Sequence, residues 1–310
     1  EALAKLKGDM IRAKDRLAEL QKKVDKSIMR LKEFEPEDGF WVGYSGGKDS
    51  DCLKILCGLA NVKHELVHSL TTVDAPETVQ YIKGQPDVKI ERPELSMWRL
   101  IEKKMFPPTR IYRYCCQELK ECGGKGRLIV TGVRWSESVR RKNNSGVMQI
   151  LGKPKRNQRL AENVGAEYTE TNGGIILNMD NAPIRRMAEQ CYRTSKTILN
   201  PIIEWTDDDV WTFLKYNGCE SNPLYQCGYS RVGCIGCPMA GKQRYKHFER
   251  YPKYKDNYIR AFRRMLEKRK EAGKAVSPSW TDGEAVFRWW LGEDLDQITI
   301  EESLRMMEEK

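Results

Sequence analysis

Six consecutive residues have the chemistry of a site for phosphate groups. They are Ser45, Gly46, Gly47, Lys48, Asp49 and Ser50, between an apolar strand expected at 40–44 and a helical pattern of apolar residues up to residue 60. Glycines permit a tight bend and leave room for a ligand. The first N–H groups of a helix lack internal partners and attract anions. We therefore predict that this bend binds nucleotide phosphates; the alternative is an ordinary turn before a helix.

Cysteines form the second group with obvious chemistry. The chain has ten, which include the adjacent pair Cys115 and Cys116 and a C-x-x-C-P motif at Cys234 and Cys237. In a reducing compartment such a count favours a metal or cluster site over disulfides. Cys52, Cys57 and Cys191 fall on helical faces and are expected to be buried.

Composition limits the classes of function. The 310 residues are 40% hydrophobic and 32% charged, without an apolar run long enough for a membrane span, and the first residues are too charged for a signal peptide. We expect a cytoplasmic protein that does not bind membranes. The net charge of +10 favours an anionic partner, either RNA or DNA or a nucleotide alone.

The elements that must position these residues indicate an α/β fold. Residues 1–36 form an N-terminal helical arm whose apolar seam either mediates a homodimer or packs on the main domain. We expect residues 37–215 to form a nucleotide-binding domain, a parallel twisted sheet with helices on both faces, and 142–180 to be an insertion with a β-hairpin. We expect residues 216–310 to form a helical C-terminal region that carries the C-x-x-C motif and ends in an acidic tail helix.

Aromatic and basic residues are interleaved over 242–271. This pattern suits single-stranded nucleic acid, where bases stack and phosphates pair with cations. The alternative is an amphipathic helix over 253–271 that buries its aromatic residues.

Two further segments end predicted strands. Asp74 follows a strand at 63–70, and Gly132, Arg134 and Arg140 follow one at 127–132. Ligands of open α/β sheets lie outside the carboxyl ends of the strands, and an arginine fork suits phosphate or sulfate. We predict that these residues contact the nucleotide. The alternatives are a helix cap for Asp74 and surface ion pairs for the arginines.

Jointly, these motifs resemble the PP-loop ATP pyrophosphatase and PAPS reductase superfamily, which includes sulfonucleotide reductases and DNA-phosphorothioation enzymes. The resemblance covers about 40–258 and includes S-G-G-K-D-S, the G-V-R segment, the adjacent cysteines, the C-x-x-C-P motif and N-P-I-I-E-W-T-D-D-D-V-W at 200–211. It implies an adenine nucleotide alpha hydrolase-like fold, catalytic roles for Lys48, Asp49 and Arg134, and ATP or PAPS as the nucleotide. We interpret 200–211 as structural, with Thr206 as helix cap and Val210, Trp211 and Leu214 buried.

The same resemblance implies a [4Fe–4S] cluster held by Cys115, Cys116, Cys234 and Cys237. Cys227 is an alternative ligand, and a structural zinc ion or free thiols are the alternatives to the cluster.

The reaction is narrowed by one difference from the sulfonucleotide reductases, whose nucleophilic cysteine lies in a C-terminal tail. No cysteine follows Cys237 here. We therefore favour ATP chemistry, in which a nucleic acid is adenylated and then thiolated, with Asp49 near Mg²⁺ and sulfur from a donor protein. The alternatives are a PAPS or APS reductase and a non-catalytic nucleotide-binding module of a larger complex.

Overall fold

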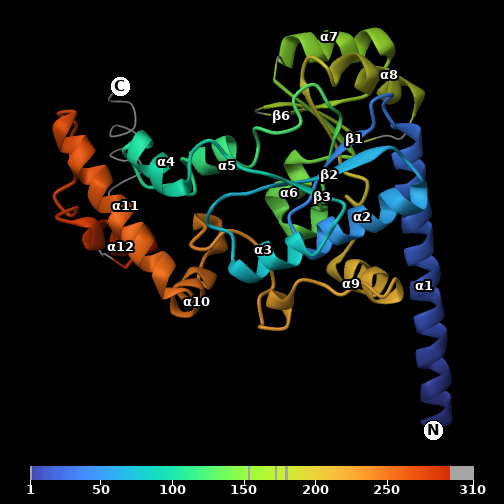
Figure 1. Cartoon of the computed structure of the whole chain (residues 1–310). Helices are drawn as coiled ribbons and strands as arrows, with labels where there is room; N and C mark the ends of the chain where they lie inside the picture. Colours follow the sequence, from blue (N-terminus) through green and yellow to red (C-terminus); the bar gives the residue numbers. More distant parts are fainter. Residues whose placement is uncertain (1, 153, 172, 179–180, 294–310) are drawn as a thin grey trace. The chain divides into compact units, whose positions relative to one another are not determined.

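The structure is a computed structural model that describes residues 2–152, 154–171, 173–178 and 181–293 (Figure 1). The chain forms two compact units, which we describe separately. Unit 1 comprises 1–68, 80–90 and 124–232, and unit 2 comprises 69–79, 91–123 and 233–310. The domain boundaries that we expect at residues 36 and 215 stay a prediction. None of the described helices is long and apolar enough to cross a membrane.

An eight-stranded sheet is the framework of the α/β fold, in the order β3-β2-β1-β4-β8-β5-β7-β6. β1 pairs in parallel with β2 and β4, and β4 pairs in parallel with β8. The strands are β1 (Phe40–Gly43), β2 (His64–Ser69), β3 (Val88–Glu91), β4 (Ile129–Val130), β5 (Met148–Leu151), β6 (Thr169–Thr171), β7 (Gly174–Leu177) and β8 (Lys196–Leu199). The predicted α/β fold is confirmed, and the sheet is mostly parallel, with antiparallel pairs at β5, β6 and β7.

The predicted insertion contributes the antiparallel part of this sheet. β5 pairs with β8 and β7, and β6 and β7 form the expected hairpin. Helices α7 (Pro154–Val164) and α8 (Ala182–Cys191) pack against each other and against strands β7 and β8, respectively. The insertion therefore extends the main sheet.

Three helices of unit 1 pack together beside the loop after β1. α2 (Lys48–Ala60) contacts both α1 (Ala2–Glu33) and α9 (Asp207–Tyr216). The seam of α1 is buried from Leu20 to Phe34, whereas Leu17 is 49% exposed. Cys52 and Cys57 of α2 are buried, as is Cys191 of α8, as predicted.

The predicted buried face of α9 is wrong at one position. Thr206 caps the helix, and Val210 and Leu214 are buried, but Trp211 is 38% exposed. Successive helical residues are about 100° apart, so residues three and four positions apart share a face and Phe213 completes it.

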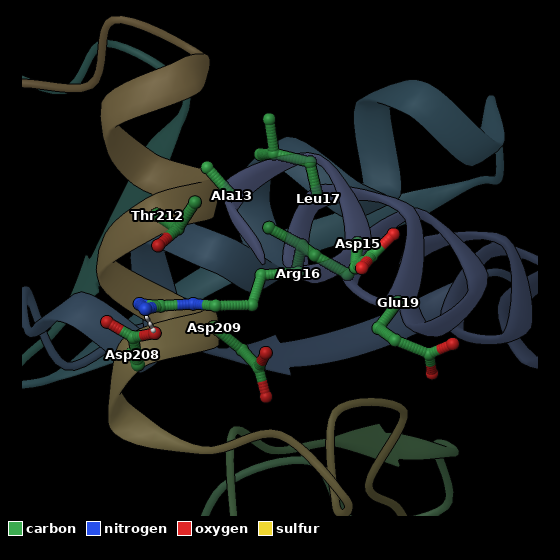
Figure 2. A pocket seen from close by; sticks show the side chains of 9 residues that line it. Ala13, Asp15, Arg16, Leu17, Glu19, Asp208, Asp209 and Thr212 are labelled. Carbon is green, nitrogen blue, oxygen red and sulfur yellow. Dashed lines mark hydrogen bonds and ion pairs between the residues drawn. The ribbon is translucent and has the colours of Figure 1, made fainter. Parts of the chain in front are cut away.

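An open groove of about 680 Å³ lies between α1 and α9 (Figure 2). Arg16 of α1 pairs with Asp208 of α9 across it, 3.4 Å apart. None of the predicted site residues lines this groove.

Unit 2 is built from helices around aromatic side chains. They are α4 (Met97–Lys104), α5 (Tyr114–Leu119), α10 (Gln243–Arg250), α11 (Pro252–Glu271) and α12 (Gly283–Leu291). Tyr258 and Phe262 of α11 are buried and contact Trp290 of α12, with ring centroids 4.7 and 5.4 Å away. The amphipathic alternative for 253–271 thus accounts for these aromatic residues. The predicted acidic tail helix lies outside the described residues.

Candidate functional site

The carboxyl ends of three parallel strands bring distant loops of unit 1 together. The segments that follow β1, β4 and β8 leave the same edge of the sheet, because these strands run in the same direction. They carry the predicted phosphate bend, the segment with Arg134, and the segment that enters α9.

The bend of residues 45–50 has the tight glycine backbone that the sequence predicts, and several of its backbone groups are hydrogen-bonded to side chains of the protein. Gly46 has a φ of +70°, which favours glycine. Ser50 Oγ accepts from the Gly47 N–H at 3.2 Å and donates to the Gly47 carbonyl at 2.8 Å. Asn222 Nδ2 donates to the Gly46 carbonyl at 3.0 Å, and the Lys48 N–H donates to Tyr225 Oη at 2.9 Å. Sequence reasoning missed Asn222 and Tyr225, which lie more than 170 positions from the bend.

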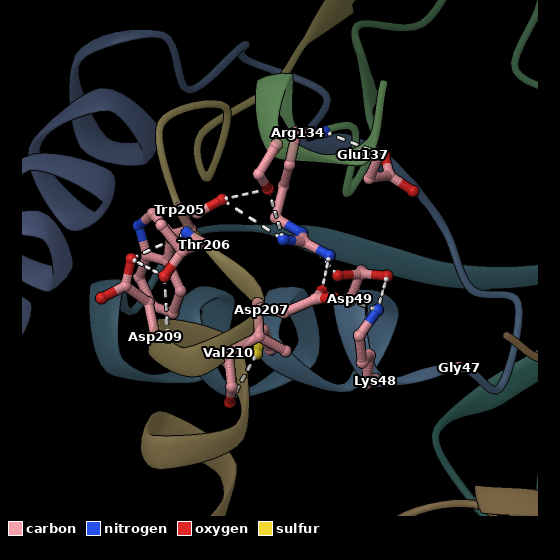
Figure 3. A network of polar contacts seen from close by, with 12 residues as sticks. Gly47, Lys48, Asp49, Arg134, Glu137, Trp205, Thr206, Asp207, Asp209 and Val210 are labelled. Carbon is pink, nitrogen blue, oxygen red and sulfur yellow. Dashed lines mark hydrogen bonds and ion pairs between the residues drawn. The ribbon is translucent and has the colours of Figure 1, made fainter. Parts of the chain in front are cut away.

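A network of two cations and two carboxylates includes Lys48 and Asp49 of the bend (Figure 3). Arg134 donates from Nε to Asp49 at 2.7 Å and from Nη2 to Asp207 at 2.6 Å. Lys48 Nζ lies 3.2 Å from the Asp49 carboxylate and 3.3 Å from that of Asp207. The structure therefore brings together the predicted Lys48, Asp49 and Arg134.

Arg134 faces protein groups on all three of its nitrogens. Nη1 donates to Ser136 Oγ at 2.8 Å and to the Trp205 carbonyl at 3.2 Å, and the side chain is 1% exposed. In this geometry Arg134 holds Asp49 and Asp207 in place. Its contact with a nucleotide stays a prediction.

Asp207 belongs to the network, although the sequence predicts only a structural role for the segment 200–211 that contains it. Its side chain is 72% exposed, whereas that of Asp49 is 23% exposed. Burial acts to raise the pKa of Asp207, but hydrogen bonding from Arg134 and the nearby Lys48 outweigh this and lower it. Asp207 therefore stays ionised and carries its charge toward solvent. In the sequence, Asp207 is the first residue of an acidic run directly after the Thr206 cap.

Gly132 permits the close approach of two segments. A Cβ at this position would lie 2.9 Å from Asp49 Cβ and 3.2 Å from the Asp49 carbonyl carbon. Because Asp49 is in the first turn of α2, any side chain at 132 would push against the start of that helix. Gly132 thus leaves the space that lets its segment approach Asp49 closely. Whether Gly132 also contacts the nucleotide stays a prediction.

Basic side chains follow Arg134 along the chain. Arg140 is exposed on the short helix α6 (Val139–Asn144), while Arg141 pairs with Glu137. Arg231 lies 3.6 Å from the same carboxylate. Arg140 is thus accessible to an anion, and its predicted contact is neither confirmed nor contradicted.

The four predicted cysteine ligands all belong to unit 2. Cys115 and Cys116 lie in the first turn of α5, and Cys234 and Cys237 flank a turn in which Gly236 has a φ of +73°. The thiol of Cys116, burial, and the nearby Cys234 and Cys237 all raise the pKa of Cys115. The four thiols therefore lie close enough to influence one another.

Two cations accompany these thiols. Arg113 Nη2 lies 3.3 Å from Cys116 Sγ, and the pKa of Cys116 is lowered by the Cys115 thiol and by this guanidinium. Cys234 raises the pKa of Lys120, while burial raises that of Cys234. The environment thus favours the thiolate at Cys116, the form that binds metals.

No three His, Cys, Asp or Glu side chains among the described residues are arranged as a ready metal site. Cys227, the predicted alternative ligand, is exposed and belongs to unit 1. The ligand set therefore stays a prediction.

Asp74 belongs to the surroundings of the cysteines in unit 2. Its carboxylate accepts from the Thr71 N–H at 2.7 Å, and its backbone pairs with that of Cys234. Tyr254 Oη donates to the Asp74 carbonyl at 3.1 Å. The predicted contact of Asp74 with a nucleotide is not tested by these bonds.

Comparisons with known proteins identify the family. An uncharacterized protein of Methanocaldococcus jannaschii is 24% identical over 275 residues, which are 84% of this chain and 57% of that protein. An adenosine 5'-phosphosulfate reductase of Oceanobacillus iheyensis is 49% identical over 37 residues, 12% of this chain and 15% of that enzyme. The chain thus spans less than two thirds of both relatives. The solved FMN adenylyltransferase of Candida glabrata, in complex with FAD and inorganic pyrophosphate, covers 71% of this chain and 64% of its own, with 14% identity and a TM-score of 0.41. The model of the phosphoadenosine phosphosulfate reductase domain matches residues 39–240, and the chain belongs to this family.

Proposed function

We propose that this chain is an enzyme that binds an adenine nucleotide, as its magnesium complex, with the phosphates at the bend of residues 45–50. One observation carries the proposal: a glycine bend, the start of α2 and the Lys48 ammonium meet at the carboxyl edge of a parallel sheet. Backbone N–H groups at a helix start and a lysine are the donors that phosphates require. Family membership supports the same assignment.

We further propose that the reaction activates a substrate for sulfur transfer. A substrate oxygen attacks the α-phosphorus of ATP, pyrophosphate leaves, and an adenylate forms. A sulfur nucleophile then replaces AMP. Lys48 would stabilise charge on the departing pyrophosphate, and Asp49 and Asp207 would orient Lys48. Exposed Arg140 would attract a polyanionic substrate such as a nucleic acid.

The cysteines of unit 2 have the donor chemistry of an iron–sulfur centre. Four thiols meet the usual ligand requirement of a [4Fe–4S] cluster, and Arg113 and Lys120 offset the negative charge of thiolates. We propose Cys115, Cys116, Cys234 and Cys237 as its ligands. When bound, the cluster would supply a site that binds or delivers sulfur.

A second candidate function is the reduction of a phosphosulfate nucleotide. It is favoured by the family of the chain and by the reductase that matches it over 37 residues. In that reaction a thiol reductant supplies two electrons, and the sulfonyl group leaves as sulfite. The nucleotide leaves as AMP from APS, or as adenosine 3',5'-bisphosphate from PAPS.

Product analysis distinguishes these candidates. Release of pyrophosphate from ATP, stimulated by RNA or DNA, supports the first function, and release of sulfite from APS or PAPS with thioredoxin supports the second. Nucleotide binding without either product would leave a non-catalytic binding module. Lys48→Ala should abolish turnover in either case.

The matched control for that variant is Lys54→Ala. Lys54 lies on the same helix, but its ammonium donates to Gln85 at 2.7 Å and to Asp87 at 2.6 Å. This variant should keep the wild-type turnover. Equal activity of Lys48→Ala and Lys54→Ala would remove the assignment of the bend.

A further inference from the structure

Tyr225 accepts a hydrogen bond from a backbone N–H group that a bound phosphate would need. The Lys48 N–H is among the first of α2 and has no partner within the helix, yet it donates to Tyr225 Oη at 2.9 Å. The same oxygen fills the space left by Gly47, because a Cβ at position 47 would lie 3.2 Å from it. The Tyr225 hydroxyl thus takes the hydrogen bond of the Lys48 N–H and fills the space beside Gly47. A glycine bend would otherwise offer both to an anion.

The contacts of Tyr225 hold its hydroxyl at the bend. Its ring meets that of Trp211 edge to face, with centroids 4.9 Å apart. Asn222 caps the short turn Pro223–Tyr225 and also bonds to the Gly46 carbonyl at 3.0 Å. The segment is therefore tied to the bend at one carbonyl and one N–H group.

The hydroxyl is a neutral acceptor. Burial raises the pKa of Tyr225, so the phenol stays protonated at neutral pH. A phosphate oxygen is a stronger acceptor, because charge-assisted hydrogen bonds are about twice as strong as neutral ones. It also gains from the positive end of the α2 dipole.

We propose that the Tyr225 hydroxyl is a displaceable cap, which competes with nucleotide phosphate for the Lys48 N–H. Phosphate binding and release of Tyr225 from the bend are then linked, and the empty bend does not expose an unpaired donor. This inference rests on the proposed function, in which the bend binds phosphates.

Pyrophosphate binding tests the competition. Tyr225→Phe keeps the ring against Trp211 and removes only the hydroxyl, so titration calorimetry should show pyrophosphate binding about fivefold tighter than in the wild type. Tyr216→Phe is the matched control, because Tyr216 is 83% exposed and lies on α9, and its affinity should equal that of the wild type. Equal or weaker binding by Tyr225→Phe would overturn the inference and leave the proposed function in place. If neither the wild type nor either variant binds pyrophosphate, the inference about Tyr225 and the proposed function are both wrong.

Hydrogen exchange of the Lys48 amide gives a second readout without ligand. It should be about fivefold faster in Tyr225→Phe than in the wild type and Tyr216→Phe, because the amide loses its acceptor. An unchanged rate would show that Tyr225 does not cap this group and would overturn the inference independently of any ligand. The amide spectrum of each variant also reports that it is folded.

Discussion

The guanidinium of Arg134 lies 2.6 Å from the carboxylate of Asp207, which is 73 positions away in the chain. The same guanidinium binds Asp49 at 2.7 Å, so one buried cation fixes a carboxylate from α2 and one from α9. The first turns of α2 and α9 are therefore both positioned by a residue of the segment that follows β4.

Removal of Arg134 should be costly for stability. Arg134→Met keeps much of the side-chain volume but removes one of the two cations, Arg134 and Lys48, that pair with both Asp49 and Asp207. Breaking a buried pair in this way costs about 3–5 kcal/mol, and we expect a loss near the lower limit because Asp207 is 72% exposed. The free energy of unfolding in urea measures it.

The control for this variant is Arg16→Met, which breaks an ion pair with Asp208. Both side chains of that pair are at least 70% exposed, so the loss should be under about 1 kcal/mol. Similar losses in the two variants would contradict a bracing role for Arg134.

Gly132 should be sensitive to the smallest side chain. The Cβ of Gly132→Ala would meet Asp49 Cβ at 2.9 Å, and a forced contact in a packed region costs about 1–3 kcal/mol. Because Asp49 must shift, nucleotide affinity should fall as well. Gly58→Ala is the control on α2, where nothing lies within 4 Å of an added Cβ. That variant should gain about 0.5–1 kcal/mol and keep its affinity, and comparable stability and affinity of the two variants would refute the steric role.

The sequence predicts those features that depend on residues close together in the chain. The phosphate bend, its strand and its helix are local, so spacing alone reveals them, and Arg134 could be inferred because it follows a strand. Asp207 could not, because the cap pattern at Thr206 already explains an acidic first turn and hides its second role. Tyr225 and Asn222 reach the bend only through tertiary packing, and no motif marks them. Trp211 was misassigned because a periodic pattern does not define where a helix face ends.

Asp51 should make stability depend on pH. Burial raises the pKa of this carboxyl from its ordinary value of 3.8 to about 6, although the hydrogen bond from Tyr44, at 2.6 Å, and the nearby Tyr81 hydroxyl oppose this. Between these two values the unfolded chain has released the proton and the folded chain still binds it. The stability that Asp51 contributes is therefore present at low pH and is lost as pH rises through about 6.

The measurement for Asp51 compares the free energy of unfolding of the wild type and Asp51→Asn. Relative to this variant, which keeps an acceptor for Tyr44, the wild type should lose about 3 kcal/mol between about pH 4 and pH 7. Asp256→Asn, at an exposed position of α11, should not show this difference. A pH-independent difference for Asp51→Asn would rule out a raised pKa in the folded state.

The cysteines of unit 2 should determine the iron content. Anaerobic reconstitution with iron and sulfide should give the wild type a brown colour and about four irons per chain, as a [4Fe–4S] cluster requires. Cys234→Ser should lose most of this iron, because three thiolates hold a cluster poorly. Cys122→Ser should keep it, since Cys122 is exposed and outside the proposed ligand set.

Cys227→Ser decides between the two ligand sets, and iron retained in this variant favours the pair Cys115 and Cys116. A colourless protein that binds one zinc ion would replace the cluster with a structural zinc site, because tetrahedral thiolate sites suit zinc equally.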